Sequence, residues 1–192
     1  MIVNCHKVLP CVAFAGVMSL TVSCSAFAEV SDATAEVGLY CQLEAFHGHV
    51  CAGSIFGARI GVAAKKALKA AGGTGKYTAK YYDLSCPVDG IQMGAGTTYG
   101  NAAIVVDDRD EHRLVLTAVG NKRQVEVRLT KKAEELGLRS RELGKKARTL
   151  ASGTPERVLL EREIETVYGW LRTAPNEEVV IIAMPKSNEG NR

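Results

Sequence analysis

The sequence has few aromatic residues, little net charge and no hydrophobic run long enough for several membrane spans. Aromatic residues make up 6% of the 192 positions, and the formal net charge is only +3. Nucleic-acid-binding surfaces are normally strongly basic, with interleaved aromatic side chains, so we expect no nucleic-acid partner. Hydrophobic residues at 46% and charged residues at 23% are typical of a globular chain. The composition therefore predicts one folded domain.

Several motifs are also missing. No Cys-x-x-Cys-His motif for covalent haem attachment is present, so haem on a histidine or cysteine axial ligand is only a minor alternative. The glycine-rich segment 94–100 lacks the lysine and the strand–loop–helix context of a phosphate-binding loop, which argues against nucleotide binding.

The first 28 residues have the three parts of a secretory signal. Lys7 is the only charge before Glu29, an apolar run follows over 8–22, and alanines occupy the −3 and −1 positions of a cut after Ala28. The run is shorter than the roughly 20 residues of a membrane span, which favours cleavage over an uncleaved anchor. A lipoprotein anchored at Cys24 is a minor option. We expect a cleavable signal over 1–28, a mature domain over 29–192, a periplasmic or secreted location and no membrane span after cleavage.

Cleavage would leave an odd number of cysteines. The mature chain keeps Cys41, Cys51 and Cys86, so at least one thiol is free, bound to a metal or paired with another chain. Cys41 has three interpretations: a disulfide to Cys51 or Cys86, a buried thiol, or a link between chains.

The hydrophobic pattern predicts an α+β domain in which an antiparallel meander packs with helices. Apolar spacing predicts a helix over 54–71 and another over 154–173. Between and after them, strands are expected at 77–84, 102–106, 113–119, 124–129 and 178–183. The Lys/Arg-rich stretch 128–148 is interpreted as a solvated helix face, in one or two helices broken near Gly137 or Gly144, with a docking surface as the alternative.

Two imidazoles and a thiol fall within five residues at His47, His49 and Cys51, beside glycines that let the backbone fold around a small centre. Histidine and cysteine are ligands of zinc and similar transition metals. Cys51 also precedes the first predicted helix, whose N-terminal amides would favour a reactive thiolate. The alternative is two surface histidines and a buried structural cysteine.

A second segment carries Cys86, Asp89 and Gln92. If a helical turn begins after Pro87, Asp89 and Gln92 lie on one face close to Cys86. Cys86 is then a fourth metal ligand or the partner of Cys51, and Asp89 could orient a histidine ligand. A structural cysteine beside a capping aspartate is the alternative.

Together these segments resemble the FmdE family of formylmethanofuran dehydrogenase proteins. The resemblance rests on His-Gly-His-x-Cys-x-Gly at 47–53, a helix with Gly57 and Arg59, Cys-x-x-Asp-x-x-Gln at 86–92 and Gly-x-Thr-aromatic-Gly at 96–100. It covers roughly residues 40–129, with a core of about 40–130 and a helical C-terminal part over 131–192. It implies an α+β core, often a homodimer, with a histidine and cysteine metal-binding or active site.

The chain departs from the family pattern at three places. Ala52 stands where proline is common, Thr97 stands where a cysteine is common, and no cysteine follows Cys86 to form a C-terminal zinc finger.

We expect a periplasmic metal- or metallocofactor-binding protein whose ligands are His47, His49, Cys51 and Cys86. Zinc is the expected metal, Asp89 and Gln92 lie alongside, and an exported redox enzyme is the expected partner. The alternative is a thiol- or metal-dependent enzyme with Cys51 as nucleophile or redox thiol and a histidine as base.

Overall fold

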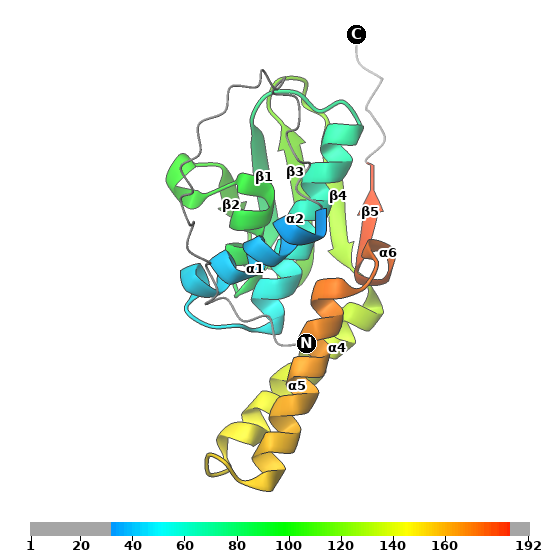
Figure 1. Ribbon diagram of the computed structural model, residues 1–192. Coiled ribbons are helices and arrows are strands. Elements are labelled where there is room, and N and C mark those ends of the chain that lie inside the picture. Colours follow the sequence, from blue (N-terminus) through cyan, green and yellow to red (C-terminus); the bar gives the residue numbers. More distant parts are fainter. Residues whose placement is uncertain (1–31, 185–192) are drawn as a thin grey trace, which may run out of the picture.

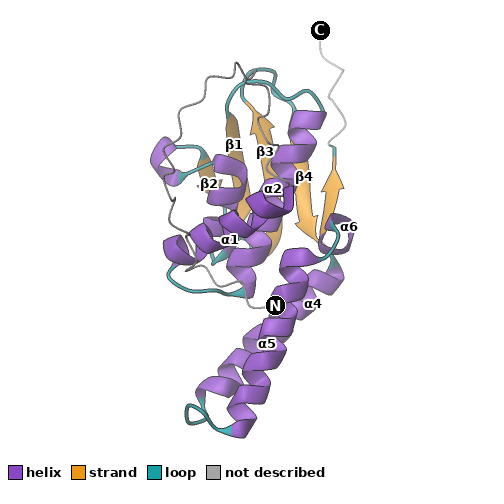
Figure 2. Cartoon of the chain, viewed as in Figure 1, coloured by secondary structure: helices purple, strands orange, loops and turns teal. Residues whose placement is uncertain are grey.

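The computed structural model describes residues 32–184, so the predicted signal lies outside the described residues. The elements follow in the order α1 (Asp32–His47), α2 (Ala52–Ala70), β1 (Tyr77–Tyr82), α3 (Pro87–Ile91), η1 (Gln92–Gly96), η2 (Tyr99–Asn101), β2 (Ile104–Val106), β3 (Glu111–Ala118), β4 (Gln124–Leu129), α4 (Lys131–Arg148), α5 (Pro155–Thr173), α6 (Asn176–Val179) and β5 (Val180–Ala183). The predicted α+β class is confirmed (Figure 2). Among the described helices, none has the length and apolar character needed to cross a membrane.

The five strands form one sheet in the order β2-β1-β3-β4-β5. All neighbours are antiparallel except β1 and β2, which run parallel with Ala79 opposite Ile104. The expected meander therefore holds for β3 and β4, whereas β2 lies on the far side of β1. Parallel neighbours need a long crossover, and α3, η1 and η2 supply it. The expected hairpin turn at 107–110 instead runs past the end of β1, where the Asp107 and Arg109 amides donate to Tyr81 and Tyr82.

The main core lies between one face of the sheet and α2. Alternate side chains of β3 and β4 are completely buried, among them Leu114, Leu116, Val125 and Val127. They belong to the same cluster as Ile55 and Ile60 of α2. Figure 1 shows α2 lying across the sheet, with α1 on the side of α2 away from the strands. The core thus fixes the position of α2, whose first turn carries the site.

Helices α4 and α5 form a long hairpin that projects away from the sheet (Figure 1). The expected break near Gly137 or Gly144 is wrong, because α4 is continuous from Lys131 to Arg148. The hairpin is held to α2 by the buried guanidinium of Arg59. It donates to the carbonyls of Leu171, Arg172 and Ala174 and to the side chain of Asn176, at 2.6–3.3 Å. These carbonyls at the end of α5 would otherwise lack helical partners.

Candidate metal centre

Three of the four predicted donors lie on the short connection between α1 and α2. His47 is the last residue of α1, His49 follows in the loop, and Cys51 is the N-cap of α2. Gly48 adopts φ +82 and its amide donates to Glu44 O at 2.9 Å, which ends α1. Glycine suits this left-handed conformation because it has no Cβ. The reversal brings the rings of His47 and His49 to a centroid distance of 4.5 Å.

Cys51 begins α2 through a capping box. Its Sγ accepts a hydrogen bond from the Ser54 amide at 3.3 Å, and the Ser54 Oγ lies 3.4 Å from the Cys51 amide that donates to it. Serine or threonine usually fills the N-cap position, and the structure gives the same role to a cysteine. The partial positive charge at the helix start favours a thiolate here, so the cap suits both metal binding and nucleophilic chemistry.

Cys86 reaches Cys51 because α2 and α3 approach each other through glycines. A Cβ on Gly57 would lie 2.2 Å from Pro87 O, and one on Gly90 would lie 2.2 Å from Ser54 O. A Cβ on Gly53 would lie 2.9 Å from Cys86 Cβ. No residue with a side chain fits at the first two positions without moving a backbone. Glycine at these positions therefore sets the distance between the two cysteines.

A chain of hydrogen bonds orients His47. Its Nδ1 lies 2.7 Å from Asp89 Oδ2, and its Nε2 lies 3.6 Å from Cys51 Sγ. An ionised carboxylate only accepts, so Nδ1 donates and Nε2 presents its lone pair to the cluster. Gln92 in turn donates from Nε2 to Asp89 Oδ1 at 3.2 Å, and the Tyr99 amide donates to Gln92 Oε1 at 2.8 Å. Asp89 and Gln92 thus lie where the sequence predicted them, with Asp89 holding the ring.

The donor atoms of His47, His49, Cys51 and Cys86 all lie within 4.8 Å of one another. Four such atoms bound tetrahedrally to zinc lie roughly 3.3–3.8 Å apart, so side-chain rotations of roughly 1 Å would close the set. Two imidazoles and two thiols are a common ligand set of that ion. The residues therefore fit a transition metal.

Both cysteines of the cluster are half-buried, and both are free thiols. The expected bridge from Cys41 to either of them is therefore absent among the described residues. Burial, and then the neighbouring Cys51, raise the pKa of Cys86 to about 11. Two adjacent thiols resist double ionisation, and a bound cation would remove that resistance because metals bind the thiolate form.

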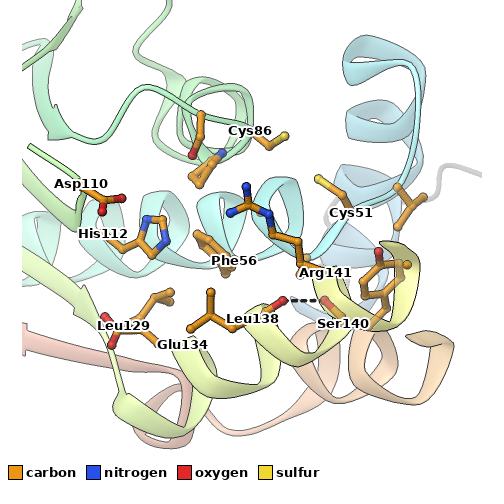
Figure 3. Close-up of a pocket in the computed structure, with 18 of the residues that line it drawn as sticks. Cys51, Phe56, Cys86, Asp110, His112, Leu129, Glu134, Leu138, Ser140 and Arg141 are labelled. Carbon is orange, nitrogen blue, oxygen red and sulfur yellow. Dashed lines mark hydrogen bonds between the residues drawn. The ribbon is translucent and has the colours of Figure 1, made fainter. Parts of the chain in front are cut away.

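A cavity of about 820 Å³ opens beside the cluster. His49, Cys51 and Cys86 line it, whereas His47 lies behind them against Asp89. Helix α4 forms the opposite wall, and Figure 3 shows Leu138 and Arg141 of that helix facing the side where the cysteines lie. The stretch 128–148 is thus more than a solvated face, because one side of α4 borders the candidate site.

His112 also lines the cavity, although the sequence suggested a solvent-facing residue in a charged turn. Its ring packs on Phe56 at a centroid distance of 4.9 Å, and its Nδ1 lies 3.0 Å from the Tyr81 hydroxyl and 3.3 Å from Asp83. The signal was present in the strand period. His112 lies two residues before the buried Leu114, so it shares the inner face of β3. Arg141 gave no such signal, since it resembles every other arginine of its helix.

Thr97 lies apart from the cluster. It is completely buried, and among the described residues its hydroxyl has no hydrogen-bond partner. The cysteine common in the resembling family would need no such partner here, because a thiol is only a weak donor.

The fold and site define an α+β protein with a histidine–cysteine cluster suited to a metal. Residues 46–181 match the family FmdE, described as "Molybdenum formylmethanofuran dehydrogenase operon", and the chain belongs to this family. Its fold is similar to that of an FmdE-like protein of tungsten formylmethanofuran dehydrogenase from Syntrophus aciditrophicus. That similarity has a TM-score of 0.51 at 20% identity and covers 77% of this chain and 70% of the other. Among curated proteins, none matches the chain.

Proposed function

We propose that this FmdE-family protein binds a transition metal, zinc by its donor chemistry, through His47, His49, Cys51 and Cys86. The observation that carries the proposal is the convergence of all four donor atoms within 4.8 Å, two of them from the α2 cap and the start of α3. The contact between Asp89 and His47 supports it, because metal-binding histidines usually donate their other nitrogen to a carboxylate or carbonyl.

The cavity supports a working site over a purely structural one. A structural zinc is enclosed by four protein ligands, whereas a working metal keeps a position open to small molecules. His49 is exposed and lies in the loop, so it is the ligand that a small molecule would displace most easily. When bound, the metal would supply a Lewis acid at the cavity wall.

We further propose that the protein is exported and acts as a homodimer in support of an exported redox enzyme, by holding or delivering a metal or metallocofactor. The signal-like residues 1–28 support export, and the family resemblance supports the dimer and the redox partner.

Cobalt titration of the metal-free protein tests the metal proposal. We expect about one ion per chain and the intense near-ultraviolet absorption of thiolate bound to cobalt. The absorption should fall strongly in Cys51→Ser and Cys86→Ser. His112→Gln is the matched control, because His112 lines the same cavity outside the donor cluster. Wild-type protein that binds no cobalt or zinc would refute the proposal.

A thiol-dependent enzyme is the second candidate, and one observation favours it. Cys51, His47 and Asp89 form a thiol–imidazole–carboxylate series with separations of 3.6 and 2.7 Å. This is the order of groups that activates a nucleophilic cysteine. Alkylation by iodoacetamide distinguishes the two. The enzyme predicts that Cys51 reacts fast with or without metal, whereas the metal site predicts that zinc protects Cys51 and Cys86 together.

A further inference from the structure

Arg141 is placed to bind something in the cavity. It lies near the middle of α4, and Figure 3 shows its side chain extending into the space between that helix and the cysteines. It makes no hydrogen bond or ion pair with any residue in the range 32–184. The paired arginines of the cavity behave differently. Arg113 and Arg128 both pair with Glu126, at 3.5 and 2.7 Å.

The remaining charges of the lining limit what Arg141 can accept. Arg148 lies two turns further along α4, while Glu134 and Asp110 bring negative charge to the cavity. Figure 3 shows these two acids near His112, away from Arg141. A polyanion such as a nucleotide would be repelled by both acids, whereas a single carboxylate fits the balance. A guanidinium binds a carboxylate through two parallel hydrogen bonds.

Apolar side chains lie beside the arginine. The Phe56 ring and the Leu138 side chain both line the cavity, and Leu138 is 60% exposed. Burying such a surface on a ligand is favourable, so the cavity suits a carboxylate that carries a hydrocarbon skeleton.

Two glycines keep the α4 wall low on either side of Arg141. Gly137 and Gly144 lie in the helix interior, where glycine is less stable than alanine. Packing does not require glycine at either place. A Cβ on Gly137 would meet the Phe56 ring at 3.6 Å, and one on Gly144 would meet Arg148 Nη1 at 3.6 Å, both ordinary contacts. Both glycines line the cavity, so their effect is to leave room in it.

We propose that the cavity binds a small organic carboxylate, with Arg141 holding the carboxylate and with Phe56 and Leu138 contacting the carbon skeleton. The inference rests on the proposed function, since it places this ligand beside the metal that His49, Cys51 and Cys86 would hold. It names the class of molecule that the centre acts on or receives.

The test uses 4-fluorobenzoate as the probe, followed by fluorine NMR with the metal-loaded full chain. We expect saturable binding that weakens at least about tenfold in Arg141→Gln, because a charged bidentate contact is lost. Arg139→Gln is the matched control. Arg139 lies on the same helix but pairs with Glu163, so its substitution should leave binding unchanged. The neutral isostere 4-fluorobenzamide should bind weakly to all three proteins.

Cobalt absorption of the same samples separates this inference from the proposed function. Metal loading without saturable binding of 4-fluorobenzoate overturns the carboxylate site and leaves the metal function intact. Equal weakening in Arg141→Gln and Arg139→Gln also overturns it, since binding would then follow net charge. Tighter binding of 4-fluorophenyl phosphate than of 4-fluorobenzoate would overturn the choice of carboxylate. Binding that depends on Arg141 in a chain that takes no metal would support the anion site and refute the metal function.

Discussion

Pairs of side chains that hold one another in place determine the geometry of the site. His47 is a useful donor because Asp89 takes its Nδ1 proton, and Cys51 is fixed because Ser54 donates to its sulfur. The first of these contacts joins residues 42 positions apart. The orientation of the donors is therefore a property of the contact between α1, α2 and α3.

The substitution Asp89→Asn should weaken metal binding while leaving the fold intact. An amide can still contact His47, but it lacks the charge that raises the basicity of the ring, so we expect roughly a 10- to 100-fold loss of zinc affinity. Competition with a chromophoric chelator measures it. Asp110→Asn is the control, since Asp110 lines the cavity without touching His47. Equal affinity in the Asp89 variant and the wild type would show that Asp89 does not act through the metal.

Among the helices, glycine has opposite roles in α2 and α4. In α2, Gly57 is required because the backbone of α3 occupies the space of a side chain. In α4, a side chain on Gly144 would make only an ordinary contact, and the helix would be more stable with one. The close contact of α2 with α3 places Cys86 beside Cys51, and the low face of α4 leaves the cavity free.

Alanine at these two positions should change stability in opposite directions. Gly57→Ala forces α2 and α3 apart and should lower the free energy of unfolding by about 3 kcal/mol. Gly144→Ala should raise it by about 0.5–1 kcal/mol, through the better helix propensity of alanine. Urea unfolding measures both. A destabilising Gly144→Ala would show that this glycine serves packing and would remove its support for the ligand cavity.

Across the whole molecule, the cavity exists only while the α4–α5 hairpin stays docked on the sheet layer. Arg59 makes the most concentrated link between them, because one buried guanidinium satisfies three carbonyls at the end of α5. The family resemblance included Arg59 without giving it a role, and the structure makes that role mechanical. A lysine has a single nitrogen and cannot reach all these acceptors at once.

Arg59→Lys should loosen the hairpin. We expect the free energy of unfolding to fall by about 2 kcal/mol, since hydrogen bonds from a charged donor are lost. Amides of residues 167–175 should exchange faster with deuterium. Arg162→Lys serves as the control, because Arg162 is exposed on α5 and makes no ion pair with any described residue. Unchanged exchange in the Arg59 variant would mean that other contacts hold the hairpin.

Features that depend on neighbouring residues could be predicted from the sequence. The α+β class, the helix beginning just after Cys51, the hairpin of β3 and β4 and the helix from Pro155 all follow from local periodicity and turn residues. The spacing of His47, His49 and Cys51 also predicted a cluster, because short-range spacing limits how far apart these side chains can lie.

Features that depend on distant segments required the folded structure. The parallel pairing of β2 with β1, the position of Cys86 at the α2 cap and the placement of His112 and Arg141 in one cavity all join residues far apart in the chain. No local pattern encodes such contacts, since they are set by how closely helices approach and how the core fills. The donor residues can thus be recognised in the sequence, whereas packing alone decides what else the proposed metal would face.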